Sequence, residues 1–406
     1  MTKELIFTIR KFPDIDNFSP IIDHLAKKKN KILIFSVNLT QDLSKDYRIS
    51  YLLKTYNCVS FVNFYDFFNL NFFQKLILDL EYSNLKNTHT LLNFIYKILK
   101  KLGLFLFLRN FFFTKKNLKF KNNLPKNLII DHLTPKKLFY FNLFFDHLRK
   151  KKTKIISIPA GLPLYTKHPK PWDKAKIEIS NLSYQVDKIV LQHKYWAKEI
   201  NEFKKLNNNY EIIGSPRYTN DWRKILNKLV KKKSYTSHKN KIKIVYMDSN
   251  NPSHIDYQKL KQNTLNFLSQ NKFYDVKFKP HPRSNKIYVK LSDDIKICQN
   301  EDSLNLIKWA DIVLGDISAI MLEVILQNKR YISLSYLRKK NNNMLYDKYK
   351  ICEECKNFNY LEKMLKTKSN FYNTKSYKKN LEKFMNDFIY FPNKNILIVY
   401  ENLIMK

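Results

Sequence analysis

Short apolar runs, separated by polar loops and by segments with helical periodicity, dominate the hydrophobic pattern of the first half of the chain. Five of these runs are rich in Ile, Leu or Phe and have the length of strands that are buried on both faces. They span residues 4–9, 31–37, 128–131, 154–159 and 210–213. Between the first two runs, Ser19 and Pro20 predict the cap and the first position of a helix over residues 18–26. Strands that alternate with helices predict a parallel sheet that helices cover on both faces.

The same rhythm starts again after a polar segment. Residues 231–241 are charged and lack any apolar period, which is typical of a linker. Further strand-like runs and a helix over 257–269 follow it. The runs span residues 242–247, 274–278, 295–298, 312–314 and 330–334. A chain of 406 residues is long enough for two such domains, each with its own core.

The loop after the run at 274–278 carries candidate chemistry. It reads Lys279-Pro-His281-Pro282-Arg283, so that two prolines hold an imidazole between two fixed positive charges. A histidine beside a phosphate tends to stay protonated, because the anion favours the charged form of the ring. The loop is therefore a candidate anion site, although a turn with an incidental histidine is an equally simple interpretation.

A second candidate loop follows the run at 312–314. Gly315 is predicted to take a positive φ in a strand-to-helix turn, and Asp316 and Ser318 fall where helix N-caps fall. The next helix is predicted to bury four apolar side chains at helical spacing, namely those of Ile320, Met321, Val324 and Ile325. The free NH groups at its start would bind an anion at the carboxyl edge of the sheet.

These two segments, Lys-Pro-His-Pro at 279–282 and Ala-Asp-Ile-Val-Leu-Gly-Asp-Ile-Ser-Ala-Ile-Met-Leu-Glu at 310–323, resemble GT-B glycosyltransferases of the bacterial surface-polysaccharide type. The pattern is similar to that of CDP-glycerol glycerophosphotransferases and of bacterial sialyl- and polysialyltransferases. In those families the His-Pro histidine and the serine loop hold the donor's phosphates, which implies this role for His281 and Ser318. Ala319 stands where the families usually have a second serine.

The resemblance implies an α/β protein with the GT-B fold: two Rossmann-like domains, a cleft between them, and C-terminal helices that pack back on the first domain. The expected divisions are an acceptor-side domain over 1–230, a linker over 231–241, a nucleotide-donor domain over 242–375 and returning helices over 376–406. The run at 186–192 resembles the strand that closes the first domain of such transferases.

Further donor contacts are expected around the cleft. The backbone NH groups of Gly214 and Ser215 are expected to approach it, and Arg217 either faces the donor's phosphates or pairs with a carboxylate at the domain boundary. Glu323 is a candidate for accepting hydrogen bonds from ribose hydroxyls, with a salt bridge as the alternative. Ser249 follows the run at 242–247, where it lies either beside a donor phosphate or in a plain solvated turn.

The group that removes the acceptor's proton is less well defined. Relatives often have a His-Gly turn where this chain has Ala160 and a glycine, so the usual base is missing if the two turns correspond. Asp131 and His132 follow one predicted strand and are substitute candidates. Asp14 and Asp16 follow another, in a predicted loop whose charges are otherwise solvated.

Charge and aromatic content point to the partners. Lys and Arg number 74 against 35 Asp and Glu, a net charge of +39, and only 4 glycines occur, a bias typical of an AT-rich genome. Residues 93–116 are basic and amphipathic, which favours contact with an anionic leaflet, although a core helix hairpin would show the same pattern. No uncharged apolar run reaches ~18 residues. Without a signal peptide, the sequence predicts a cytoplasmic protein, peripheral on the inner membrane.

The resemblance therefore implies a transferase that moves a sugar or polyol phosphate from a nucleotide-activated donor, favouring the CMP or CDP type, to a surface polysaccharide or glycolipid, in capsule or lipopolysaccharide biosynthesis. No metal site is predicted, because no convincing Asp-x-Asp motif occurs and the Cys352/Cys355 pair is alone. No cofactor is expected. The alternatives are a nucleotide-sugar 2-epimerase and a nucleic-acid-binding protein, although the basic residues are spread along the chain without a recognised binding motif.

Overall fold

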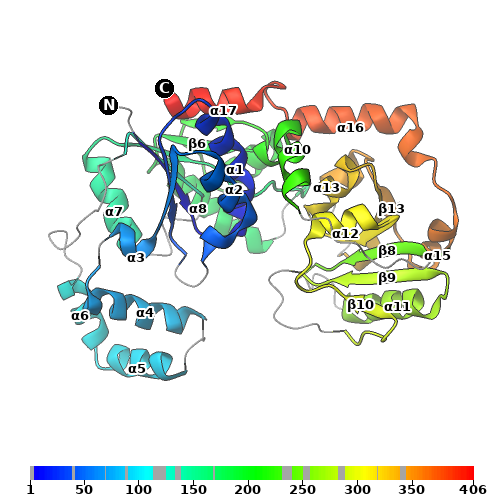
Figure 1. Ribbon diagram of the computed structural model, residues 1–406, viewed down its shortest axis with the longest axis horizontal. Coiled ribbons are helices and arrows are strands. Elements are labelled where there is room, and N and C mark those ends of the chain that lie inside the picture. Colours follow the sequence, from blue (N-terminus) through cyan, green and yellow to red (C-terminus); the bar gives the residue numbers. More distant parts are fainter. Residues whose placement is uncertain are drawn as a thin grey trace.

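Two parallel β-sheets form the framework of the protein, as the computed structural model shows (Figure 1). The structure describes residues 4–38, 42–68, 70–86, 90–112, 125–132, 139–167, 170–230, 240–249, 257–281, 289–317, 319–338 and 344–406. The first sheet has seven strands, in the order β3-β2-β1-β4-β5-β6-β7: β1 (Leu5–Ile9), β2 (Ile32–Ser36), β3 (Val59–Asn63), β4 (Asn127–Ile130), β5 (Lys154–Ser157), β6 (Lys188–Leu191) and β7 (Tyr210–Ile212). The second has six, in the order β10-β9-β8-β11-β12-β13: β8 (Ile242–Met247), β9 (Tyr274–Lys279), β10 (Ile295–Ile297), β11 (Ile312–Gly315), β12 (Arg330–Leu334) and β13 (Glu353–Cys355).

All neighbouring strands in both sheets are parallel, so their carboxyl ends gather at one edge of each sheet. Helices connect them: α1 (Phe12–Lys27), α2 (Tyr47–Thr55), α3 (Phe64–Phe67), α4 (Phe72–Lys86), α5 (Thr90–Lys101), α6 (Leu104–Phe112), α7 (Phe139–Lys150), α8 (Asp173–Ser183), α9 (Lys194–Phe203), α10 (Asn220–Leu229), α11 (Tyr257–Gln270), α12 (Ser303–Trp309), α13 (Ile320–Leu326), α14 (Leu345–Lys348), α15 (Phe358–Lys366), α16 (Lys375–Phe388) and α17 (Ile396–Met405).

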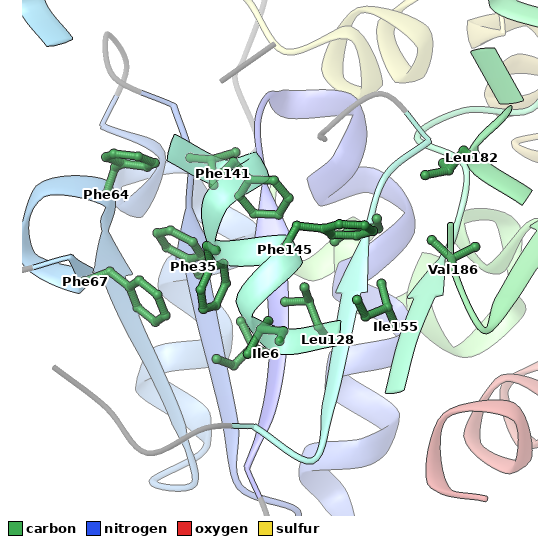
Figure 2. Packing of buried hydrophobic residues seen from close by; sticks show 14 of the residues in the cluster. Ile6, Phe35, Phe64, Phe67, Leu128, Phe141, Phe145, Ile155, Leu182 and Val186 are labelled. Carbon is green, nitrogen blue, oxygen red and sulfur yellow. The ribbon is translucent and has the colours of Figure 1, made fainter. Parts of the chain in front are cut away.

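Alternate side chains of each strand enter the cores on opposite faces of the sheet. Ile6 and Leu128 belong to the core under α7, which contributes Phe141 and Phe145 (Figure 2). The intervening Phe7 belongs to the core on the other face, with α1 and α2. This burial on both faces explains the continuous apolar runs of the sequence.

The C-terminal helix α17 packs on the first domain, as expected. Tyr400 is fully buried in the core beside α1, and its hydroxyl donates a hydrogen bond to the carbonyl of Gly214 at 2.9 Å. His24 Nε2 lies 2.8 Å from a carboxylate oxygen of Glu401. The preceding helix α16 contributes Phe384 to a core of the second domain. The chain thus crosses from the second sheet back to the first (Figure 1).

The predicted start of the first helix was wrong. Helix α1 begins at Phe12 rather than after Ser19, and Pro20 lies inside it. The Asp14 carboxylate accepts hydrogen bonds from the backbone NH groups of Arg10 and Lys11, at 2.8 and 3.1 Å, and so stabilises this earlier start. Asp14 and Asp16 are therefore helical residues and not members of a solvated loop.

No helix among the described residues is long and apolar enough to cross a membrane. Most of the predicted linker, residues 231–239, lies outside the described residues.

Candidate functional site

A cleft of about 760 Å³ is lined by residues from both domains. The second domain contributes the segments that follow the carboxyl ends of β8, β9 and β11, and the first domain contributes parts of α1 and α2 and the loop after β5. Ligands of open parallel sheets bind at such strand ends. The volume is in the range of small-molecule sites.

The loop after β9 brings Lys279, Pro280 and His281 into this cleft. The ammonium group of Lys279 donates one hydrogen bond to the carbonyl of Gln299 at 2.8 Å, and burial lowers its pKa from the ordinary value. Because an ammonium group has three donors, two are left for other partners. The next two sequence candidates, Pro282 and Arg283, lie outside the described residues.

The segment after β11 lines the same cleft through Ile317, Ala319 and Ile320, followed by Glu323 in the first turn of α13. Ser318, the expected phosphate ligand, lies between these residues but outside the described part of the chain. The described residues on either side of Ser318 therefore share one hollow with His281.

Gly315 and Asp316 differ from the sequence expectations. Gly315 does not have a positive φ; instead, an added Cβ would lie 2.9 Å from the hydroxyl of Tyr331. Asp316 does not cap α13, whose N-cap residue is Ala319. Its side chain is 2% exposed, and burial raises its pKa to about 7. Its carbonyl accepts hydrogen bonds from Arg338 at 2.8 Å and from the Tyr346 hydroxyl, so that the strand end rests on a buried polar layer.

Ser249 and its neighbour Asp248 complete this wall at the end of β8. The Asp248 carboxylate forms a 2.5 Å ion pair with Lys261 on α11, and burial raises its pKa from the ordinary value. The Ser249 hydroxyl lies 3.1 Å from the hydroxyl of Tyr257. Both side chains are buried, so the plain solvated turn considered for Ser249 was wrong.

A chain of ion pairs connects the two domains across the cleft. One oxygen of Asp16 accepts from Arg48, and the other lies 2.7 Å from Arg217 Nη1. Arg217 Nε reaches the carboxylate of Glu323 in the second domain at 3.3 Å. Arg48 also forms a two-pronged contact with Asp46, at 2.9 and 2.7 Å. Arg217 therefore pairs with carboxylates from both sides, which is the alternative that the sequence left open.

Burial disfavours the charged forms of both Glu323 and Arg217 in this series of ion pairs. Burial raises the pKa of Glu323 above its ordinary value, although the charge of Arg217 opposes the shift. Burial by itself would lower the pKa of Arg217, but Asp16, Tyr218 and Glu323 together outweigh it, so the pKa lies above the ordinary value. Two guanidinium groups at the cleft wall therefore stay charged, as the binding of a phosphate requires.

The loop after β5 provides the apolar part of the first-domain wall, with Leu162, Leu164 and Tyr165. His193 caps α9 and donates from Nε2 to the carbonyl of Pro163 at 2.7 Å, while its Nδ1 accepts from a backbone NH. Tyr165 pairs as an isolated antiparallel bridge with Met344 of the second domain. The ring centroid of Trp172 lies 6.2 Å from that of Tyr165. This loop thus joins both domains at the cleft.

Three of the four candidate bases lie away from the cleft. Asp131 is 1% exposed and forms a 2.7 Å ion pair with Arg10. His132 donates from Nε2 to the carbonyl of Val190 at 2.9 Å, and burial lowers its pKa to about 4. Burial, reinforced by the charge of Asp131, raises the pKa of Asp14 to about 8. Of the four candidates, only Asp16 lines the cleft.

Gly214 and Ser215 contact the end of α16 and the residues that follow it. Their NH groups donate to the carbonyls of Phe391 and Phe388, at 2.8 and 3.2 Å, so the expected approach of these groups to the cleft was wrong. An added Cβ on Gly214 would lie 2.3 Å from the carbonyl oxygen of Ile389. Gly214 is thus required for close packing.

Several cleft residues have no motif that marks them. Tyr47, Arg48, Trp172 and Asp302 line the cleft, although no pattern in the sequence points to them. The loop from Leu162 to Tyr165 had one usable signal, since it follows a predicted strand at the carboxyl edge of the sheet. Among the described residues, no group of three or more His, Cys, Asp or Glu side chains forms a metal-ligand set.

Comparison with protein-family profiles and with curated protein sequences finds no match. Solved structures do match over the whole length. MnaA from S. aureus with UDP is 12% identical, with 100% of this chain and 98% of that chain covered and a TM-score of 0.51. UDP-GlcNAc 2-epimerase from Neisseria meningitidis bound to UDP-GlcNAc is 11% identical, with 99% and 100% covered and a TM-score of 0.50.

The glycotransferase of kitacinnamycin is 7% identical, with 100% of both chains covered and a TM-score of 0.50. At these identities the likeness concerns the fold alone. Together with the two parallel sheets, it confirms the expected α/β architecture of the GT-B type.

Proposed function

We propose that this protein is a GT-B transferase that moves a sugar or polyol phosphate from a nucleotide-activated donor to a surface polysaccharide or glycolipid acceptor. One observation carries the proposal: the loops after β9 and β11, the two motifs that resemble such transferases, line a single cleft together with residues of the first domain. Proteins of this fold include structures with bound UDP and UDP-GlcNAc, which supports a nucleotide sugar as the donor.

In this proposal the second domain binds the nucleotide. The leaving nucleotide phosphate gains negative charge, which Lys279 and His281 stabilise from one loop and the segment around Ser318 from the other. Glu323 accepts hydrogen bonds from the ribose when its contact with Arg217 opens. The guanidinium of Arg217 is then available to the phosphates. These groups supply the charge stabilisation without a metal or cofactor.

The first domain holds the acceptor. Tyr165 and Trp172 offer aromatic faces to a sugar ring, and Asp16 is the first-domain carboxylate on the described cleft wall. Asp16 either takes the proton of the acceptor hydroxyl or holds Arg48 and Arg217 in place. An Asp16→Asn variant separates these roles: loss of a base lowers kcat with little change in KM, whereas loss of arginine positioning raises the KM for the donor.

Thermal stabilisation by CMP, CDP, UDP, GDP and their sugars tests donor binding. A nucleotide at 100 times its Kd adds about 2.7 kcal/mol of stability, which corresponds to a rise in Tm of roughly 3 °C if the whole chain unfolds as one unit. His281→Ala should reduce this rise for the best nucleotide. His147→Ala, a half-buried histidine of α7 outside the cleft lining, is the matched control and should leave it unchanged.

The reaction itself is tested by product analysis with the nucleotide sugar that binds best. Transfer to an added glycan or glycolipid supports the proposal. Formation of an epimer or of free sugar without an acceptor indicates an epimerase-like enzyme instead. The absence of any nucleotide-dependent stabilisation, together with salt-sensitive retention of RNA, indicates a nucleic-acid-binding protein.

A further inference from the structure

Helices α4, α5 and α6 present an unusual amount of apolar surface. Of the 22 large hydrophobic side chains that are exposed in the described part of the chain, twelve lie between Phe72 and Phe111. Six of these twelve are more than 60% exposed, namely Phe72, Leu91, Phe94, Leu102, Phe107 and Phe111. Exposed apolar surface on this scale marks an interaction site.

The exposure follows a regular pattern on α5 and α6. Leu91, Phe94, Ile98 and Leu102 recur at helical spacing along α5 and into the turn after it, and Leu104, Phe107 and Phe111 do so on α6. The opposite faces pack inward, where Tyr96 and Phe105 are buried with a ring-centroid distance of 4.7 Å. Each helix therefore already has a core-facing side, and the outer stripes are additional to it.

These outer stripes carry only positive charge. Between Thr90 and Phe112, which covers α5 and α6, the charged residues are Lys97, Lys100, Lys101 and Arg109, without any Asp or Glu. Helix α4 differs, because it carries an exposed Asp79, which accepts a hydrogen bond from the Tyr65 hydroxyl. The three lysines of α5 are exposed. Lys97 and Lys101 lie three and seven positions after Phe94 and so flank the apolar stripe of α5, whereas the ammonium group of Lys100 lies over the ring of Tyr96, 5.9 Å from its centroid. Long basic side chains extend from an apolar stripe toward phosphate groups, so this combination is complementary to the headgroup layer of an anionic membrane.

A second copy of this chain fits the surface less well. Each molecule has a net charge of +39, and a symmetric contact through α5 would place lysines opposite lysines. The three helices also lie at the outer edge of the first domain, at the lower left of Figure 1, where a flat bilayer can approach them. None of the described side chains of α4, α5 or α6 lines the cleft, so binding at this surface leaves the cleft open.

We propose that α4, α5 and α6 form a docking surface for anionic phospholipid membranes, with the exposed Phe and Leu side chains inserted at the level of the headgroups. This inference extends the proposed function, because it places the transferase at a membrane that would hold a glycolipid acceptor. The lipid binding itself does not depend on the reaction.

Flotation of the full chain with vesicles tests the docking surface. The arms are phosphatidylglycerol mixed with phosphatidylcholine, and phosphatidylcholine alone. The protein should float with the anionic vesicles, and raising the salt concentration should weaken the binding. Phe94→Ser combined with Phe107→Ser should lower the partition coefficient at least ~10-fold. Phe273→Ser, at a 73% exposed position of the second domain, is the control and should have no effect.

A charge variant tests the electrostatic part without touching the apolar stripe. Lys97→Gln, Lys100→Gln and Lys101→Gln together should weaken binding to anionic vesicles roughly 10- to 100-fold. The control removes the same charge elsewhere, at Lys45, Lys356 and Lys366, whose side chains are 83%, 78% and 63% exposed. These three substitutions should leave most of the binding intact.

Three results would overturn the proposal: no flotation with anionic vesicles, equal flotation with neutral ones, or equal losses from the surface variants and their controls. A dimer in sedimentation velocity that Phe94→Ser with Phe107→Ser converts to monomer, without lipid binding, would assign the surface to a second copy. A nucleotide-induced rise in Tm that is the same in the surface variants and the wild type separates this proposal from donor binding.

Discussion

At the scale of single residues, two carboxylates on α1 have different roles, because one is fully buried and the other lies on the cleft wall. Asp16 lies on the cleft wall between two guanidinium groups. Asp14, two positions earlier on α1, is fully buried and stabilises the helix start. Both residues had the same candidate role in the sequence, because local pattern does not reveal which side of the helix faces the cleft.

The raised pKa of Asp14 predicts that the free energy of unfolding depends on pH. Its folded pKa of about 8 lies above the ordinary value of 3.8, because of burial and the nearby Asp131. The folded state therefore holds the proton more tightly than the unfolded state, and the contribution to stability is complete below about pH 4 and falls as the pH rises to about 8. Relative to Asp14→Asn, the wild type should lose roughly 2–5 kcal/mol over this range.

Urea unfolding of both proteins between pH 4 and 9 measures this difference. The exposed Asp293→Asn substitution is the control and should run parallel to the wild type. A constant gap between the wild type and Asp14→Asn over the whole range would show that Asp14 is ionised in the folded protein.

At the scale of elements, several strands and the helix over 257–269 were predicted closely, whereas the start of the first helix was not. Parallel strands buried on both faces leave continuous apolar runs, and the runs at 31–37, 242–247 and 312–314 match β2, β8 and β11 closely. The first helix was misplaced because Ser19 and Pro20 imitate a start signal, whereas the real start depends on the Asp14 carboxylate. Local sequence does not distinguish these two helix-start signals.

The missing side chain of Gly214 allows the end of α16 to pack closely against the first domain. Alanine at this position would place a Cβ 2.3 Å from the carbonyl oxygen of Ile389, so the end of α16 has to move. Gly214→Ala should cost roughly 1–3 kcal/mol of unfolding free energy. Gly161→Ala is the matched control, because its added Cβ meets no atom within 4 Å. Equal stabilities of the two variants in urea unfolding would show that this packing is looser than described.

At the scale of the whole molecule, the site depends on how two sheets face each other. The motifs around His281 and Gly315 were found because each directly follows an apolar strand-like run, and in the structure they lie at the ends of β9 and β11, on either side of β8. The partners across the cleft, such as Arg48 and Tyr165, depend on the relative placement of the domains, which no periodicity in the sequence encodes.

The ion pairs across the cleft predict unequal losses of stability for substitutions of Arg217 and of Glu323. Glu323 is 3% exposed, so Arg217→Ala leaves a buried carboxylate without its partner and should cost about 3 kcal/mol. Glu323→Gln should cost less than about 1 kcal/mol, because Arg217 keeps its 2.7 Å contact with Asp16. Chemical unfolding of both variants measures the difference. A larger loss for Glu323→Gln than for Arg217→Ala would refute this assignment.

The central claim is that the loops after β9 and β11 hold a nucleotide between them. A crystal structure of the protein with the nucleotide that gives the largest rise in Tm tests this claim most directly. The phosphates should lie within hydrogen-bond distance, about 3 Å, of Lys279 or His281 on one side and of the segment 317–320 on the other. A nucleotide bound elsewhere, with this cleft empty, would contradict the claim.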